Sequence, residues 1–124
     1  MRLINETSYD SKWIKPFLQK IVKSEGLDHS EYVVHITNRR GRYSKLKGCA
    51  GYAYHRKIWW DRYKIKNKYY VKLKIPTKLF DANSVFKVMV HELAHTRGLR
   101  HKDMINITKI KIPSFVETFK TETF

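Results

Sequence analysis

The chain has 124 residues, of which 42% are apolar and 14% aromatic. This composition excludes an intrinsically disordered chain and suffices for one domain, which we place over residues 1–124. The single cysteine, Cys49, excludes an internal disulfide, and no apolar run reaches the length of a signal peptide or a membrane span. We therefore expect a cytoplasmic protein without a membrane-spanning segment.

The net charge of +15 is concentrated in the middle of the chain. Residues 1–38 hold five Lys/Arg and five Asp/Glu, whereas residues 39–80 hold fourteen Lys/Arg and one acid, Asp61. Eight Tyr and Trp residues are interleaved with these cations. Two interpretations stay open for segment 39–78: it binds nucleic acid through phosphate contacts and stacked bases, or it is a solvated surface with its aromatic residues in the core.

The first predicted element is a helix near the N-terminus. Asp10 or Ser11 is a suitable N-cap, and Gly26 is suited to end the helix. Pro16 favours a start nearer Lys15. Apolar residues recur at helical spacing at Trp13, Ile14, Phe17, Leu18, Ile21 and Val22.

Two strands are predicted in the following segment. The β-branched run Glu31–Thr37 indicates a strand, and residues 38–42 indicate a turn after it. Residues 43–66 give no clear element. The alternating run Tyr69–Ile75 predicts a half-buried strand at or near an edge of the sheet, closed by Pro76.

A second helix begins after a cluster of capping residues, Asp81, Asn83 and Ser84. It is apolar almost all round, so we expect it to run through the middle of the domain until Gly98 ends it. A short last helix over residues 114–119 is expected to pack on the core. These elements together predict a small α+β fold.

The chemistry is concentrated at the end of the second helix. His91 and His95 are four residues apart, which places both imidazoles on one helical face within reach of one ion. Gly98 lets the chain turn, so that His101 can supply a third ligand. Three ligands leave a coordination position open, as in catalytic zinc sites, and Glu92 is placed to act as the general base toward a metal-bound water.

The predicted cofactor is one Zn²⁺ per chain, because three imidazoles with an open position suit zinc better than harder cations. One alternative stays open from the residues alone. In it, His91, His95 and His101 are core histidines with their hydrogen bonds satisfied, and Glu92 is a capping residue.

Residues 91–101 resemble the metzincin signature H-E-x-x-H-x-x-G-x-x-H, and so resemble the zincin metallopeptidases. The resemblance implies a mixed sheet above a central active-site helix, with an edge strand antiparallel to the bound peptide substrate. Tyr69–Ile75 is the strand we expect in that place. Metzincins also carry a methionine turn well downstream, whereas Met104, three residues beyond His101, is the only methionine that follows.

The segment from His91 to Met104 is also similar to the SprT-like and WLM peptidases, in which a third histidine follows at short range. Those families include proteases that act on proteins bound or crosslinked to DNA. YbeY-like endoribonucleases arrange three histidines in a similar way but lack the glutamate, so Glu92 favours a peptidase. We expect a zinc metallopeptidase, with a SprT-like DNA–protein crosslink protease or a YbeY-like metal-dependent ribonuclease as alternatives.

Overall fold

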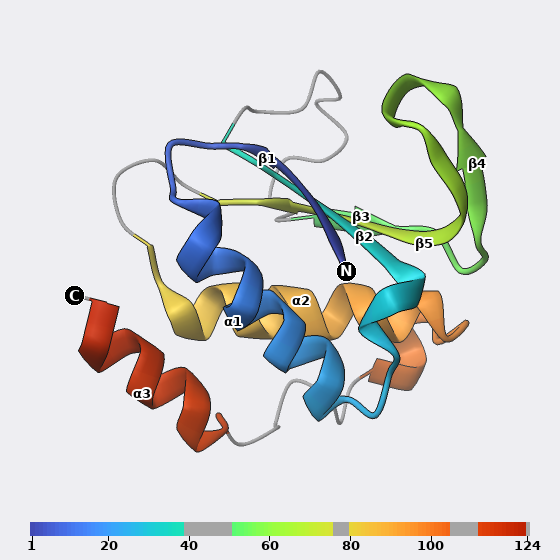
Figure 1. The fold of residues 1–124 in the computed structure, drawn as a ribbon. Coiled ribbons are helices and arrows are strands. Elements are labelled where there is room, and N and C mark those ends of the chain that lie inside the picture. Colours follow the sequence, from blue (N-terminus) through green and yellow to red (C-terminus); the bar gives the residue numbers. More distant parts are fainter. Residues whose placement is uncertain (39–50, 76–79, 105–111, 124) are drawn as a thin grey trace.

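The computed structural model describes residues 1–38, 51–75, 80–104 and 112–123 (Figure 1). Its helices are α1 (Ser11–Ser24), α2 (Ala82–Thr96) and α3 (Ser114–Thr123). Its strands are β1 (Arg2–Glu6), β2 (Tyr32–Thr37), β3 (Gly51–Ala53), β4 (Ile58–Trp60) and β5 (Ile65–Lys74). Short 3-10 helices are η1 (His29–Glu31), η3 (Asp61–Tyr63) and η4 (His101–Met104).

The strands form a mixed sheet in the order β1-β2-β5-β3, which confirms the α+β fold class. β2 lies between β1 and β5 and pairs with both in the parallel direction, and β3 pairs with β5 in the antiparallel direction. β4 also pairs antiparallel with β5, at the other end of that long strand. The N-terminal strand β1 was not predicted, and β3 and β4 lie in the stretch that gave no clear element.

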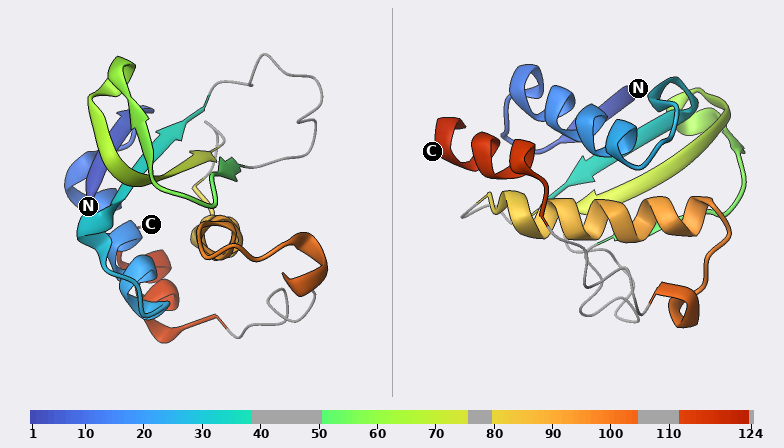
Figure 2. Two further views of the ribbon diagram at one scale, coloured as in Figure 1. Left: turned by 90° about the vertical axis from the view of Figure 1, so that its right-hand side faces the viewer. Right: turned by 90° about the horizontal axis from the view of Figure 1, so that it is seen from below.

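All three helices lie on one face of the sheet, as Figures 1 and 2 show. α2 packs against β5 and β3, and α1 packs against α2. The buried residues of β2 and β5 on this face are Tyr32, Val34, Ile36, Val71 and Leu73, and Ile75, directly after β5, is buried with them. Val116 is fully buried in the same core, which confirms that the last helix packs there. Within the described residues, no helix combines the length and apolar character needed to cross a membrane.

A smaller cluster covers the opposite face of the sheet. Val33, Ile65 and Tyr70 are buried in it. The Trp60 ring closes over this face, with its centroid 5.4 Å from that of Tyr70 and 5.1 Å from that of Tyr63. The ribbon formed by β4 and the first half of β5 is therefore held to the sheet by aromatic packing.

Helix α1 begins at Ser11, so the later start that Pro16 suggested is wrong. The Asp10 carboxylate accepts a hydrogen bond from the Lys12 N–H at 2.9 Å and caps the helix. Pro16 lies in the second turn, where the missing N–H removes one helical hydrogen bond. The buried face of α1, which includes Ile14 and other core residues, outweighs that loss.

The strand predicted at Tyr69–Ile75 extends over Ile65–Lys74 and is not an edge strand. It has β2 on one side and β3 on the other, so only the near-edge prediction holds. Among the described strands, β3 ends this side of the sheet. The turn expected after β2 lies, beyond Asn38, outside the described residues, as does Cys49.

Candidate metal centre

Helix α2 places the first two histidines. The Asp81 carboxylate caps it by accepting from the Asn83 and Ser84 N–H groups. Met89, Leu93 and other apolar residues fix its rotation by packing into the core. His91 and His95 then emerge half-buried on one face, with their Nε2 atoms 3.2 Å apart.

The third histidine reaches this face because the helix ends at Gly98. Gly98 has φ +83°, a left-handed conformation that favours glycine. Its N–H donates to the His95 carbonyl at 2.9 Å, and the Leu99 N–H donates to the Ala94 carbonyl at 3.2 Å. This pair of bonds is the Schellman motif, which turns the chain back along the helix. His101 follows as the first residue of η4.

The rings of the three histidines form a compact triangle. Ring centroids are 4.8 Å apart for His91 and His95, 5.2 Å for His91 and His101, and 5.0 Å for His95 and His101. One ligand nitrogen from each ring lies within 4.8 Å of the others. The structure therefore brings together all three predicted ligands.

A hydrogen bond fixes the tautomer of His95. Its Nδ1 lies 3.0 Å from the Leu99 carbonyl oxygen, so Nδ1 carries the proton and donates it. Nε2 is then unprotonated and has the lone pair that a metal requires. The same loop is stabilised at η4, where the Asp103 carboxylate accepts from the Arg100 N–H at 3.0 Å.

The separation of the first two ligands fits zinc. Zinc binds imidazole nitrogen at about 2.0–2.1 Å, which places two tetrahedral ligands about 3.3 Å apart. The Nε2 atoms of His91 and His95 are 3.2 Å apart. Burial, followed by the neighbouring His95 and His101, lowers the pKa of His91 and favours the neutral imidazole that binds metals. His101 is exposed, so its ring can adjust without disturbing the core.

Glu92 is buried in α2 beside the first ligand. Its side chain is 4% exposed, and Oε2 has no hydrogen-bond partner among the described residues. Burial raises its pKa from 4.5 to about 7. A buried carboxylate oxygen without a partner is rare in folded proteins, and a bound ion or water is a common reason for one. This orphan atom therefore fits a metal–water site.

The arginines in the motif make ion pairs at the protein surface. An Arg97 nitrogen is 3.9 Å from a Glu25 oxygen, and the Arg100 Nε is 3.8 Å from an Asp103 oxygen. At these distances and exposures the pairs contribute little to stability. The Met104 side chain, on which the methionine turn would depend, lies outside what the structure describes.

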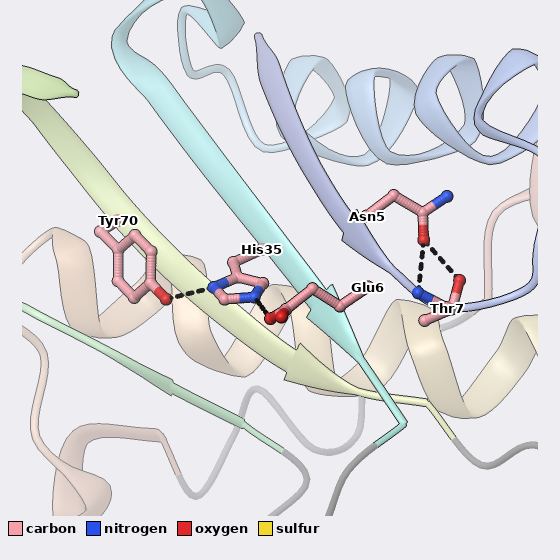
Figure 3. A network of polar contacts seen from close by, with 5 residues as sticks. All are labelled: Asn5, Glu6, Thr7, His35 and Tyr70. Carbon is pink, nitrogen blue, oxygen red and sulfur yellow. Dashed lines mark hydrogen bonds and ion pairs between the residues drawn. The ribbon is translucent and has the colours of Figure 1, made fainter. Parts of the chain in front are cut away.

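A second polar centre, on the other face of the sheet, was not predicted. Figure 3 shows His35 between Tyr70 and Glu6, which brings β2, β5 and β1 together. His35 Nδ1 is 2.6 Å from the Tyr70 hydroxyl, and Nε2 contacts the Glu6 carboxylate. Burial lowers the pKa of His35 more than Glu6 raises it. The neutral ring then accepts from Tyr70 and donates to Glu6, so it ties three strands together.

Of the basic segment 39–78, the structure describes residues 51–75. No protein-family model, curated protein or solved structure matches the chain. The interpretation of the candidate metal centre therefore depends on its own geometry.

Proposed function

We propose that this protein is a zinc-dependent metallopeptidase. His91, His95 and His101 hold the ion, and Glu92 is the general base. The observation that carries the proposal is the convergence of three imidazoles on one point, together with a buried Glu92 oxygen, next in sequence to His91, that has no hydrogen-bond partner among the described residues. Histidines with a purely structural role would not require that buried carboxylate.

Bound zinc would supply a polarised water whose pKa lies near 7, close to the pH at which a hydrolase works. Glu92 would take the proton from this water at Oε2 and deliver it to the leaving amine. Burial suits the carboxylate to both steps, because a pKa of about 7 lets it accept and release a proton near neutral pH. His95 keeps its lone pair toward the ion through its bond to the Leu99 carbonyl.

The edge strand that would receive an extended peptide is β3, in place of the predicted Tyr69–Ile75. β3 is antiparallel to β5 and packs against α2, the helix that carries the histidines. Gly51 holds β3 close to its neighbour, since a Cβ there would collide with the Lys72 carbonyl oxygen. The backbone of β3 would bind peptide by strand addition.

A nuclease is the second candidate, because a zinc-bound water can also attack a phosphodiester. The cations of segment 51–75 favour it, since Lys and Arg neutralise phosphates. Glu92 favours the peptidase, as argued from the sequence. A SprT-like protease that acts on proteins bound to DNA would combine the two features. We also propose a cytoplasmic location, since Cys49 is the single cysteine.

The first test is metal content. The purified protein should bind about one zinc per chain, measured by atomic spectroscopy after dialysis. His95→Ala should lower the content to near zero, whereas His55→Ala, which removes an exposed histidine outside the cluster, should not. A wild-type chain that takes up no zinc after reconstitution would refute the proposal.

The second test separates the two activities. Fluorescent casein and single-stranded RNA are offered to wild type and to Glu92→Gln, with a chelator control. Casein cleavage that Glu92→Gln lowers by roughly 10²–10⁴-fold, with zinc retained, supports the peptidase. RNA cleavage with no cleavage of casein would assign the site to the nuclease.

A further inference from the structure

The ribbon of β4 and β5 has an unusual outer face. Trp59 is 72% exposed, whereas the neighbouring Trp60 packs over the sheet. Side chains alternate between the faces of a strand, so Trp59 points away from the cluster that buries Trp60. An exposed indole contributes little to the core, and its flat apolar ring with a polar N–H is available to a binding partner.

One cation lies next to this indole, and others are exposed in the same ribbon. Lys66 is the cross-strand partner of Trp59, and adjacent residues on paired strands lie within about 4.5–5.5 Å at Cβ. Lys64 follows at the end of the ribbon in a left-handed conformation, φ +56°, and is exposed. Arg56 and Arg62 are also exposed, and Asp61 is the single acid between residues 54 and 68.

The ribbon is a firm support for these side chains. Its inner face is held by Trp60, whose ring meets Tyr63 at 89° and Tyr70 at 82°. Lys57 pairs with Glu31 at 3.0 Å, and the Lys68 ammonium donates to the Ser30 carbonyl at 2.9 Å. Two lysines therefore anchor the ribbon, while Lys64 and Lys66 are exposed and the Arg62 guanidinium lies 5.3 Å from the centroid of the Tyr63 ring.

We propose that this outer face binds single-stranded nucleic acid, with a base stacked on Trp59 and phosphates on Lys64 and Lys66. A flat exposed ring flanked by cations matches the alternation of bases and phosphates in a single strand. A duplex keeps its base faces stacked internally, and an acidic peptide has no flat ring for the indole. One exposed Trp also gives little apolar area for a membrane surface.

This site is separate from the metal centre. The histidines lie on the helical side of the sheet, whereas Figures 1 and 2 show the β4–β5 ribbon turning away from the helices at the end of the sheet. The two proposals share no residue, so each can fail without the other.

The test uses fluorescence anisotropy of a labelled oligothymidylate of about 12 nucleotides, titrated at several salt concentrations. Wild type should bind with an affinity that falls as salt rises. Trp59→Ala should weaken binding at least about fivefold with an unchanged salt slope, since a stacked base is lost and no phosphate contact is. Its melting temperature should stay close to wild type, because Trp59 is exposed.

The phosphate contacts are tested with a matched pair of double variants. Lys64→Gln/Lys66→Gln should reduce the salt slope by about 1.4, because each single-strand phosphate contact contributes about 0.7. Lys12→Gln/Lys20→Gln removes the same charge from exposed positions on α1, across the sheet, and should leave the slope unchanged.

Three results would overturn the proposal. The first is equal binding by Trp59→Ala and wild type. The second is an equal loss of salt slope in the two double variants, which would show that binding responds to net charge alone. The third is binding of a duplex, or of phosphatidylserine vesicles, as tight and as dependent on Trp59 as binding of the single strand.

Discussion

Replacing Glu92 by Gln should make the zinc-free protein more stable, although the same change should lower the proposed peptidase activity. The carboxylate is 4% exposed and its Oε2 has no partner among the described residues. Glutamine has nearly the same shape and carries no charge. The substitution therefore removes the cost of burying an ionised group while it leaves the packing in place.

The magnitude follows from the pKa of Glu92, which burial raises from 4.5 to about 7. A tenfold change in an equilibrium constant corresponds to about 1.4 kcal/mol, so ionised Glu92 destabilises the folded state by about 3 kcal/mol. Below pH 4.5 the group is protonated whether the chain is folded or unfolded, and the cost vanishes. As pH rises toward 7, the unfolded chain ionises first and wild type loses stability relative to Glu92→Gln.

The assay is thermal unfolding of zinc-free protein at pH 4, 6 and 8. At pH 8, Glu92→Gln should melt roughly 10 °C above wild type, and at pH 4 the two should nearly coincide. Asp61→Asn, which neutralises an exposed carboxylate, is the control and should show no such growing difference. If Glu92→Gln melts no higher than wild type at pH 8, the reasoning is refuted. The carboxylate would then have a partner in the metal-free protein that compensates its charge.

The remaining predictions concern other residues of the two polar centres. His101→Ala should weaken zinc binding at least tenfold in a chelator competition, with little change in the melting temperature of the metal-free protein, because His101 is exposed. Gly98→Ala should cost about 1 kcal/mol of stability in denaturant titration and weaken zinc binding, since alanine is strained at φ +83° and the turn places His101. Zinc-saturated wild type should lose stability as pH falls below 6.5, because burial lowers the pKa of His35 and the unfolded chain binds the proton first. His35→Gln should flatten that loss, and an unaltered pH profile would contradict this interpretation.

The convergence of the three histidines was predictable because it depends on local rules. Two histidines four residues apart share a face in any α-helix, and a glycine beyond the last turn favours a left-handed end. Both rules hold here: His91 and His95 share a face of α2, and Gly98 adopts the left-handed conformation. The bond from His95 Nδ1 to the Leu99 carbonyl is equally local, but it requires the loop geometry.

The sheet was less predictable because strand pairing is decided at long range. β3 has three residues and no distinctive pattern, yet its presence removes β5 from the edge. Trp59 and Trp60 are adjacent and identical, and only the register of β4 on β5 decides which one packs against the sheet. His35 likewise has no local signal, since Glu6 and Tyr70 come from strands far away in the chain.

The charge distribution bears directly on the metal proposal. The chain has 26 Lys/Arg against 11 Asp/Glu, and exposed or half-buried acids such as Glu31 and Asp103 pair with cations. Glu92 is the one buried carboxylate among the described residues, and burial alone accounts for its raised pKa. In a chain so rich in cations, a buried carboxylate that no described cation pairs with, next in sequence to one of three converging histidines, favours a cation supplied from outside, and a bound zinc ion would offset the cost that Glu92 imposes on the metal-free fold.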